Sequence, residues 1–166
     1  MNFHTIVVIV ILTFTSLAVS SCTSNEERIR QIVKEELSAA LERHTFTDEK
    51  TIGPYSTAQQ VGNFLFVSGQ IAINRQTGVL NNENIETETR VVLDNIMNIL
   101  RQANYDSTDV ITTTVYLREI GDYQRMNLIY GGYFQEGRYP VRTTVQVAAL
   151  PREARVEISA IAFKSH

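Results

Sequence analysis

The chain has 166 residues, of which 43% are hydrophobic and 20% are charged, and its formal net charge is −3. This composition is typical of one compact domain with a single core. The mildly acidic balance lacks the basic stripe that attracts a phosphate backbone, which argues against a nucleic-acid partner. The single cysteine, Cys22, excludes an intrachain disulfide and a zinc site built on several thiolates.

An apolar run opens the chain and predicts a targeting segment. Ile6 to Leu12 is unbroken, and no charged side chain precedes Glu26. The run ends in Val19-Ser20-Ser21-Cys22, which resembles the lipobox of bacterial lipoproteins, in which the cysteine is diacylated. We therefore predict a lipoprotein signal peptide over residues 1–21, lipidation of Cys22, and a lipid-anchored location in the bacterial cell envelope, outside the cytoplasm.

The first residues, Met1 to His4, carry no Lys or Arg, whereas a signal peptide normally begins with positive charge. An uncleaved anchor helix is the alternative. The apolar run is shorter than the ~20 residues that a bilayer span needs, which favours the lipidated form.

The next segment, residues 22–44, predicts an amphipathic helix that serves as a short stalk. Ser24-Asn25-Glu26-Glu27 has the spacing of a capping box, and a helix is expected from about Asn25 to Arg43. One side of it is apolar, through Ile29, Ile32, Val33, Leu37, Ala40 and Leu41. Glu36 falls where a coiled-coil seam needs an apolar residue, so a long coiled coil is disfavoured and the helix is expected to lie against the domain or the membrane surface.

Residues 45–166 alternate short strands with helices and predict one globular domain. Strands are expected over 64–68 and 110–117, and a turn over 74–78. An amphipathic helix is expected over 84–103, and a shorter helix with an aromatic side over 122–134. The pair Gly131-Gly132 weakens that second helix and marks close packing or an early end.

The last two predicted strands, 142–147 and 155–163, are joined by a short connection, and antiparallel pairing is the simplest interpretation. This places Arg142 and Glu157 on neighbouring strands. An arginine binds a carboxylate through two parallel hydrogen bonds, and a nearby carboxylate orients a water for attack on an electrophilic carbon. A cross-strand ion pair that only supports the sheet is the alternative.

Alternation along these strands predicts a sheet with two different faces. One face is apolar and suited to cover by the two helices. The other carries the polar residues, including Arg142, Thr144 and Glu157, and is expected to hold Phe64, Phe66, Val110 and Tyr116 as well. Such a half-apolar face is usually buried against another copy, so we predict a homo-oligomer with polar clefts between subunits.

Five segments in this order resemble the RidA/YjgF/UK114 family of imine deaminases, from about Thr45 to Lys164. The segments are Ile52-Gly53-Pro54-Tyr55, Val67-Ser68-Gly69-Gln70-Ile71, Asn127-Leu128-Ile129-Tyr130 with Phe134, Tyr139-Pro140-Val141-Arg142, and Val156-Glu157-Ile158-Ser159-Ala160-Ile161-Ala162. The resemblance implies a chorismate-mutase-like α+β fold, with a mostly antiparallel sheet and two helices on one face. It also implies a homotrimer with three active sites in the clefts between subunits.

The resemblance further implies hydrolysis of reactive 2-imino acids or enamines to 2-oxo acids and ammonia, without a metal or organic cofactor. Carried over by position, Arg142 binds the substrate carboxylate and Glu157 activates water. Tyr55, Ser68 and Asn127 match further substrate-binding positions. Thr144, which stands where many members have cysteine, is also predicted to bind substrate.

Two other functions stay open. The first is a lipid-anchored trimer that binds small carboxylates without physiological catalysis, although a carboxylate such as Glu157 beside an anionic ligand favours hydrolysis. The second is an endoribonuclease, which the acidic balance and the predicted export disfavour. Export is itself a departure, because members of the family are mostly cytosolic.

Overall fold

The computed structural model describes residues 25–38, 41–46 and 53–165. The chain divides into two compact units, and the boundary in the sequence lies between Glu42 and Arg43. The predicted signal peptide and Cys22 lie outside the described residues. So do Ile52, in the first of the motif segments, and Ala40 of the predicted apolar stripe.

The first unit contains a helix over residues 25–38. Its apolar side chains are exposed, with Val33 and Leu37 each at 57%. The predicted extension to Arg43 is wrong, because Arg43 pairs with Val61 and begins a strand. None of the helices among the described residues has the length and apolar character that a bilayer span requires.

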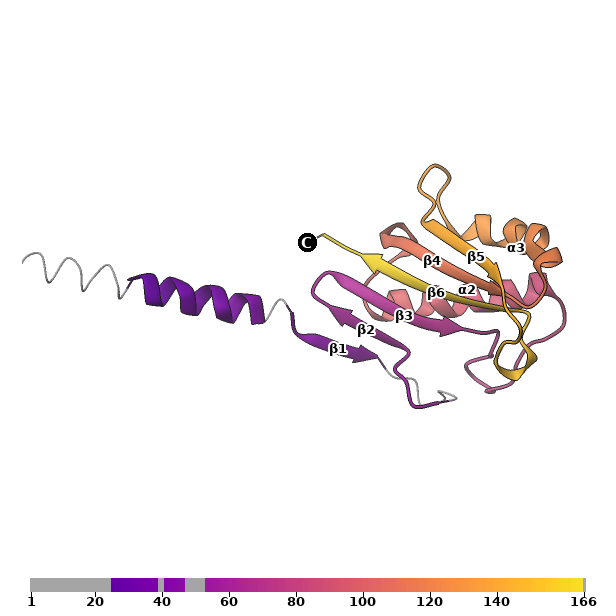
Figure 1. The fold of residues 1–166 in the computed structure, drawn as a ribbon, viewed down its shortest axis with the longest axis horizontal. Helices are drawn as coiled ribbons and strands as arrows, with labels where there is room; N and C mark the ends of the chain where they lie inside the picture. The colour runs from indigo at the N-terminus through magenta and orange to yellow at the C-terminus, as the bar shows by residue number, and fades with distance from the viewer. Residues whose placement is uncertain (1–24, 39–40, 47–52, 166) are drawn as a thin grey trace, which may run out of the picture. The chain divides into compact units, whose positions relative to one another are not determined.

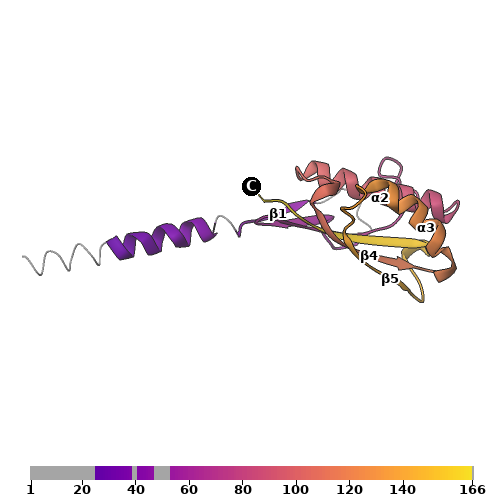
Figure 2. The same cartoon turned by 90° about the horizontal axis from the view of Figure 1, so that it is seen from above.

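The second unit is a six-stranded sheet with two α-helices on one face, as Figures 1 and 2 show. The strands are β1 (Arg43–Phe46), β2 (Ala58–Val61), β3 (Phe64–Gln70), β4 (Val110–Leu117), β5 (Val141–Gln146) and β6 (Val156–Phe163). The helices are α2 (Ile85–Gln102) and α3 (Tyr123–Tyr130), with short 3-10 turns at Ser107–Asp109, Ile120–Asp122, Gly131–Tyr133 and Pro151–Glu153. The predicted α+β class and two-layer architecture are confirmed.

The strand order is β1-β2-β3-β6-β4-β5, and every neighbouring pair is antiparallel except β4 and β5, which are parallel. The predicted pairing of the last two strands is therefore wrong, because β4 lies between them. The crossover through α3 returns the chain parallel to β4, as such connections do. Strand β6 then enters the middle of the sheet, where Ile158 and Ala162 are completely buried.

The core lies between the sheet and α2, whose apolar side is buried as the 3.6-residue period predicts. The side chain of Asn84 accepts a hydrogen bond from the backbone of Thr87 and begins the helix. The fully buried Glu88 joins α2 to the sheet, since its carboxylate accepts hydrogen bonds from the backbone N of Arg155 at 2.8 Å and from its Nη1 at 2.7 Å.

The helix α3 ends at Tyr130, and Gly131 and Gly132 continue it as one 3-10 turn. The predicted early end is thus confirmed. Close packing is not its cause, because a Cβ at either glycine would meet no atom within 4 Å.

The face assignment of two strands differs from the prediction. Because β5 runs parallel to β4, Arg142 pairs with Thr113 and Thr144 pairs with Val115. Thr113 and Val115 are buried on the helix side, so Arg142 and Thr144 lie on that side too, and not on the open face. Val110 also belongs to the core, because an irregularity in the register of β4 next to it reverses its side chain.

Candidate functional site

Five of the predicted site residues, Tyr55, Ser68, Asn127, Arg142 and Glu157, lie in two separate pockets. The first, the arginine pocket, has a volume of about 360 Å³ and is lined by Asn127, Tyr130, Gly131, Tyr139, Pro140 and Arg142. The second, the glutamate pocket, has a volume of about 220 Å³ and is lined by Tyr55, Ser68, Gly69, Ile71, Pro151 and Glu157.

Within one protomer, Arg142 and Glu157 do not meet. Arg142 lies on the helix side of β5, whereas Glu157 pairs with Tyr116 on the open face of β6, and β4 separates the two strands. The prediction that they occupy neighbouring strands is therefore wrong. The same geometry excludes the alternative of a cross-strand ion pair within the chain.

Aromatic side chains hold the guanidinium of Arg142. Its central carbon lies 4.6 Å from the ring centroid of Tyr130 and 5.6 Å from that of Tyr123. Its Nη2 donates a hydrogen bond to Tyr123 Oη at 3.1 Å. Among the described residues Arg142 has no acidic partner, so its charge is stabilised by ring faces and stays available to an anion.

The two tyrosines around Arg142 have different environments. Tyr130 is buried, and its Oη forms a hydrogen bond of 2.7 Å with Thr113 Oγ1. Burial raises the pKa of Tyr130. By contrast, a hydrogen bond from Asn127 and the charge of Arg142 lower the pKa of Tyr123.

Two buried polar atoms near Arg142 have no hydrogen-bond partner among the described residues. They are Oδ1 of Asn127, in the arginine pocket, and Oγ1 of Thr144, two positions along the same side of β5. Buried polar groups normally form hydrogen bonds, so Oδ1 of Asn127, whose residue lines the pocket, is suited to a polar group of a ligand. Thr144 itself does not line the arginine pocket.

The glutamate pocket is built around a half-buried carboxylate. Burial raises the pKa of Glu157, which lies on β6. A Cβ at Gly69 would collide with this carboxylate, so only glycine leaves room for it. An irregularity of β3 between Val67 and Gln70 brings Ser68 and Gly69 to this position, as bulges beside active sites often do.

Hydrogen bonds fix the side chain of Ser68. Its Oγ donates to the backbone carbonyl of Thr57 at 2.9 Å and accepts from Gln70 Nε2 at 3.1 Å. The rim of the pocket includes an unusual backbone conformation. Pro151 precedes Arg152 and Glu153, two residues with left-handed φ of 55° and 60°, a backbone conformation that costs free energy outside glycine.

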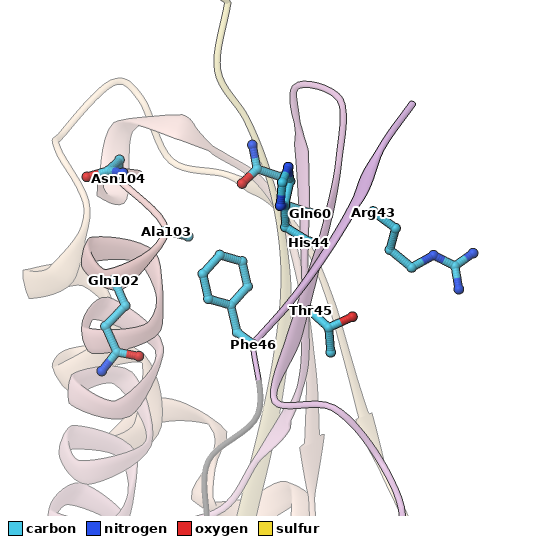
Figure 3. Close-up of a pocket in the computed structure, with 8 residues that line it drawn as sticks. All are labelled: Arg43, His44, Thr45, Phe46, Gln60, Gln102, Ala103 and Asn104. Atoms are coloured by element: carbon cyan, nitrogen blue, oxygen red, sulfur yellow. The ribbon is translucent and has the colours of Figure 1, made fainter. Parts of the chain in front are cut away.

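A third groove, of about 600 Å³, lies between β1 and the C-terminal end of α2 (Figure 3). It is larger than the other two pockets but contains none of the predicted site residues. Phe46 points toward Ala103 across the groove, whereas Arg43 and Thr45 point away from α2. Its lining includes Arg43 and His44, but Arg43 points away from α2, so charged groups do not converge in this groove. Among the described residues, no three His, Cys, Asp or Glu side chains gather to hold a metal ion.

Tyr130 and Gly69 line the pockets and Tyr123 contacts Arg142, but none of the three was predicted as a site residue. Tyr123 and Tyr130 belong to the aromatic side of the predicted second helix, which was the available signal. Gly69 lies in one of the five motif segments, but only the register of β3 against β6 shows what it does.

The profile of the endoribonuclease L-PSP family matches residues 46–164. The chain belongs to this family. The predicted membership of the RidA/YjgF family is thereby confirmed. Because the match begins at Phe46, it spans both pockets and excludes the helix over residues 25–38.

Three proteins illustrate the family relationship. A RutC family protein of Pyrococcus horikoshii is 48% identical over 115 residues, which cover 69% of this chain and 90% of that protein. The 2-iminobutanoate/2-iminopropanoate deaminase of Mus musculus is 44% identical over 113 residues, 68% of this chain and 83% of the relative. The structure of E. coli TdcF with bound serine has a TM-score of 0.68 and 32% identity, and the match covers 74% of this chain and all of TdcF (100%).

Proposed function

We propose that this protein hydrolyses small 2-imino acids or enamines to 2-oxo acids and ammonia, at sites shared between identical subunits. The observation that carries the proposal is the division of the site. One pocket offers an arginine without an acidic partner among the described residues, and the other offers a half-buried glutamate with a raised pKa. Neither pocket alone has both the group that binds a carboxylate and the group that activates water.

A second copy of the chain is the simplest way to join the halves. The open face of the sheet exposes Phe64, Phe66 and Phe163, at 41%, 44% and 38%, and the rings of Phe64 and Phe163 lie 4.9 Å apart. Val141 and Val145 extend this apolar surface onto β5, at 71% and 40% exposure. Such a surface favours burial against another subunit, and a homotrimer is the assembly that the family resemblance implies.

The proposed chemistry uses only side chains and water. Arg142 binds the substrate carboxylate through parallel hydrogen bonds, which orients the imine carbon. Glu157 of the adjoining subunit accepts a proton from water while the water oxygen bonds to that carbon, and the C=N π electrons move to nitrogen. Glu157 passes this proton to the nitrogen, which gives the carbinolamine. Glu157 then takes the hydroxyl proton and delivers it to the amino group as C=O forms and the C–N bond breaks, so the products are the 2-oxo acid and ammonia.

The comparisons support this reaction class. The mouse relative is named for deamination of 2-iminobutanoate and 2-iminopropanoate, and the TdcF structure holds serine, a small amino acid with a carboxylate. The family's description as an endoribonuclease has less support in this chain, because the net charge is −3.

The alternative function is binding of small carboxylates without catalysis. The arginine pocket considered by itself favours this alternative. Glu157 is the argument against it. An ionised carboxylate close to an anionic ligand weakens binding, so its presence is better explained by hydrolysis.

We further propose that the protein acts from the envelope side of a membrane, held by acyl chains on Cys22. The lipobox-like sequence before Cys22 supports this location. The substrate would then be an imine released outside the cytoplasm, for example by an amino-acid oxidase or dehydrogenase. Replacing Cys22 with alanine should move the protein from the membrane to the soluble fraction; retention in the membrane would contradict lipid anchoring.

The activity is tested with full-length protein in detergent and 2-iminobutanoate generated in situ by an amino-acid oxidase. We expect the wild type to accelerate formation of 2-oxobutanoate and the Arg142→Ala variant to lose this acceleration. Arg101→Ala, an exposed position at the end of α2, is the matched control and should behave as the wild type. Equal rates for Arg142→Ala and wild type would contradict the proposal.

A further inference from the structure

The guanidinium of Arg142 is held by two tyrosines that contribute different interactions. Tyr130 presents its ring face, 4.6 Å from the guanidinium carbon. Its hydroxyl forms a hydrogen bond with Thr113 instead of with Arg142. Tyr123 contributes its ring more distantly, at 5.6 Å, but accepts a hydrogen bond from Nη2 at 3.1 Å.

These two interactions constrain the guanidinium differently. A ring face attracts the charge but leaves the planar group free to rotate above it, because the cation–π attraction depends weakly on that rotation. A hydrogen bond from one named nitrogen fixes the rotation. Rotation matters here because bidentate binding of a carboxylate requires two N–H groups to point the same way.

We propose that Tyr123 is a positioning residue for carboxylate recognition, and this inference rests on the proposed function of Arg142. By accepting a hydrogen bond from Nη2, its hydroxyl directs the remaining N–H groups of Arg142 into the arginine pocket. The orientation exists before the ligand arrives, so little rotational freedom is lost on binding.

Asn127 supports the same arrangement from the other side of the hydroxyl. It lines the arginine pocket and forms a hydrogen bond with Tyr123 that, together with Arg142, lowers the pKa of this phenol. Oη of Tyr123 thus has two donors. Asn127 lies one helical turn after Tyr123 on α3, so both groups are fixed by the same rigid element.

Tyr123→Phe tests the proposal, because it keeps the half-buried ring and removes only the hydroxyl. Tyr133→Phe is the matched control, since its hydroxyl donates to Asp94 Oδ1 at 2.8 Å and to the carbonyl of Arg90, away from Arg142. Full-length wild type and both variants are compared in detergent by calorimetric titration with 2-oxobutanoate and by steady-state hydrolysis of 2-iminobutanoate.

We expect Tyr123→Phe to raise both the Kd for 2-oxobutanoate and the KM for 2-iminobutanoate by roughly ten- to a hundredfold, the effect of one hydrogen bond to a charged group. Its kcat should stay within about twofold of wild type, because the hydroxyl acts on ground-state binding. Tyr133→Phe should leave Kd, KM and kcat unchanged. A purely structural role of the Tyr123 hydroxyl would lower Tm and the active fraction without this selective change in KM.

An unchanged Kd and KM in Tyr123→Phe would overturn the inference, and so would a loss confined to kcat. If the wild type binds 2-oxobutanoate but does not hydrolyse the imine, the proposed hydrolysis fails alone and the Kd values still decide the role of Tyr123. If the wild type binds no carboxylate, the inference about Tyr123 fails together with the assignment of Arg142.

Discussion

At the scale of single residues, the role proposed for Glu157 in catalysis and its contribution to folding stability oppose each other. Burial raises the pKa of its carboxyl group, because the charged form loses hydration. The folded protein therefore holds this proton to a higher pH than the unfolded chain does. The contribution of Glu157 to stability is present below the ordinary pKa of a glutamate and is lost as the pH rises through the raised value.

Replacing Glu157 with glutamine should separate the two effects. We expect kcat for imine hydrolysis to fall by roughly 10²- to 10⁴-fold, the usual contribution of a general base. The Tm at neutral pH should rise, because glutamine carries no charge to desolvate. In the wild type, kcat should decrease as the pH falls through the raised pKa of Glu157. The residual kcat of the variant should not show this decrease at acidic pH. An unchanged kcat, or an acid limb retained in the variant, would remove Glu157 from the mechanism.

Gly69 allows an independent test of the same carboxylate. A methyl group at this position would collide with the Glu157 side chain and displace it. We expect Gly69→Ala to lower kcat by about tenfold or more, since misplacing a catalytic group by about 1 Å has such effects. Binding of 2-oxobutanoate by the arginine pocket should persist. Gly121→Ala, where a Cβ meets no atom within 4 Å, is the control, and similar kcat values for the two variants would refute the steric argument.

At the scale of secondary-structure elements, local sequence patterns predicted where the helices and strands lie along the chain. They did not predict the order of the strands in the sheet, which depends on contacts between distant residues. The period of 3.6 residues located α2, and the β-branched run from Val110 to Leu117 located β4. Nothing local to β5 or β6 indicates that β4 lies between them. That pairing also determines the face of Arg142, so one misplaced strand changed the predicted geometry of the site.

The link between α2 and β6 depends on a buried charge. Glu88 is completely buried and pairs with Arg155, whose side chain is 30% exposed. We expect Glu88→Ala to lower the free energy of unfolding by about 3 kcal/mol, because it leaves Arg155 without its partner. The measurement is urea denaturation followed by circular dichroism. Glu153→Gln, which alters the exposed pair with Arg118, should change the same quantity by less than about 0.5 kcal/mol, and equal losses would contradict the account.

At the scale of the whole molecule, the chain carries two separate pockets and a sheet face with exposed apolar side chains. The arginine pocket lies beside the edge strand β5, and the glutamate pocket opens beside β3 and β6. Most of the residues that line these pockets lie in the family motifs, and five of them were predicted as site residues: Tyr55, Ser68, Asn127, Arg142 and Glu157. The sequence also predicted clefts between subunits, from the half-apolar face of the sheet. It placed Arg142 and Glu157 on neighbouring strands, which is wrong, because strand order and register depend on contacts across the folded sheet.

Mixing two inactive variants tests the shared site most directly. Arg142→Ala and Glu157→Gln proteins are unfolded together in equal amounts, refolded in detergent, and assayed for hydrolysis of 2-iminobutanoate. If one subunit supplies Arg142 and its neighbour supplies Glu157, random assembly restores roughly a quarter of the wild-type activity, while each variant refolded alone stays inactive. If the mixture stays as inactive as its components, although wild type refolded in the same way recovers its activity, the site is not shared between subunits and the account is wrong.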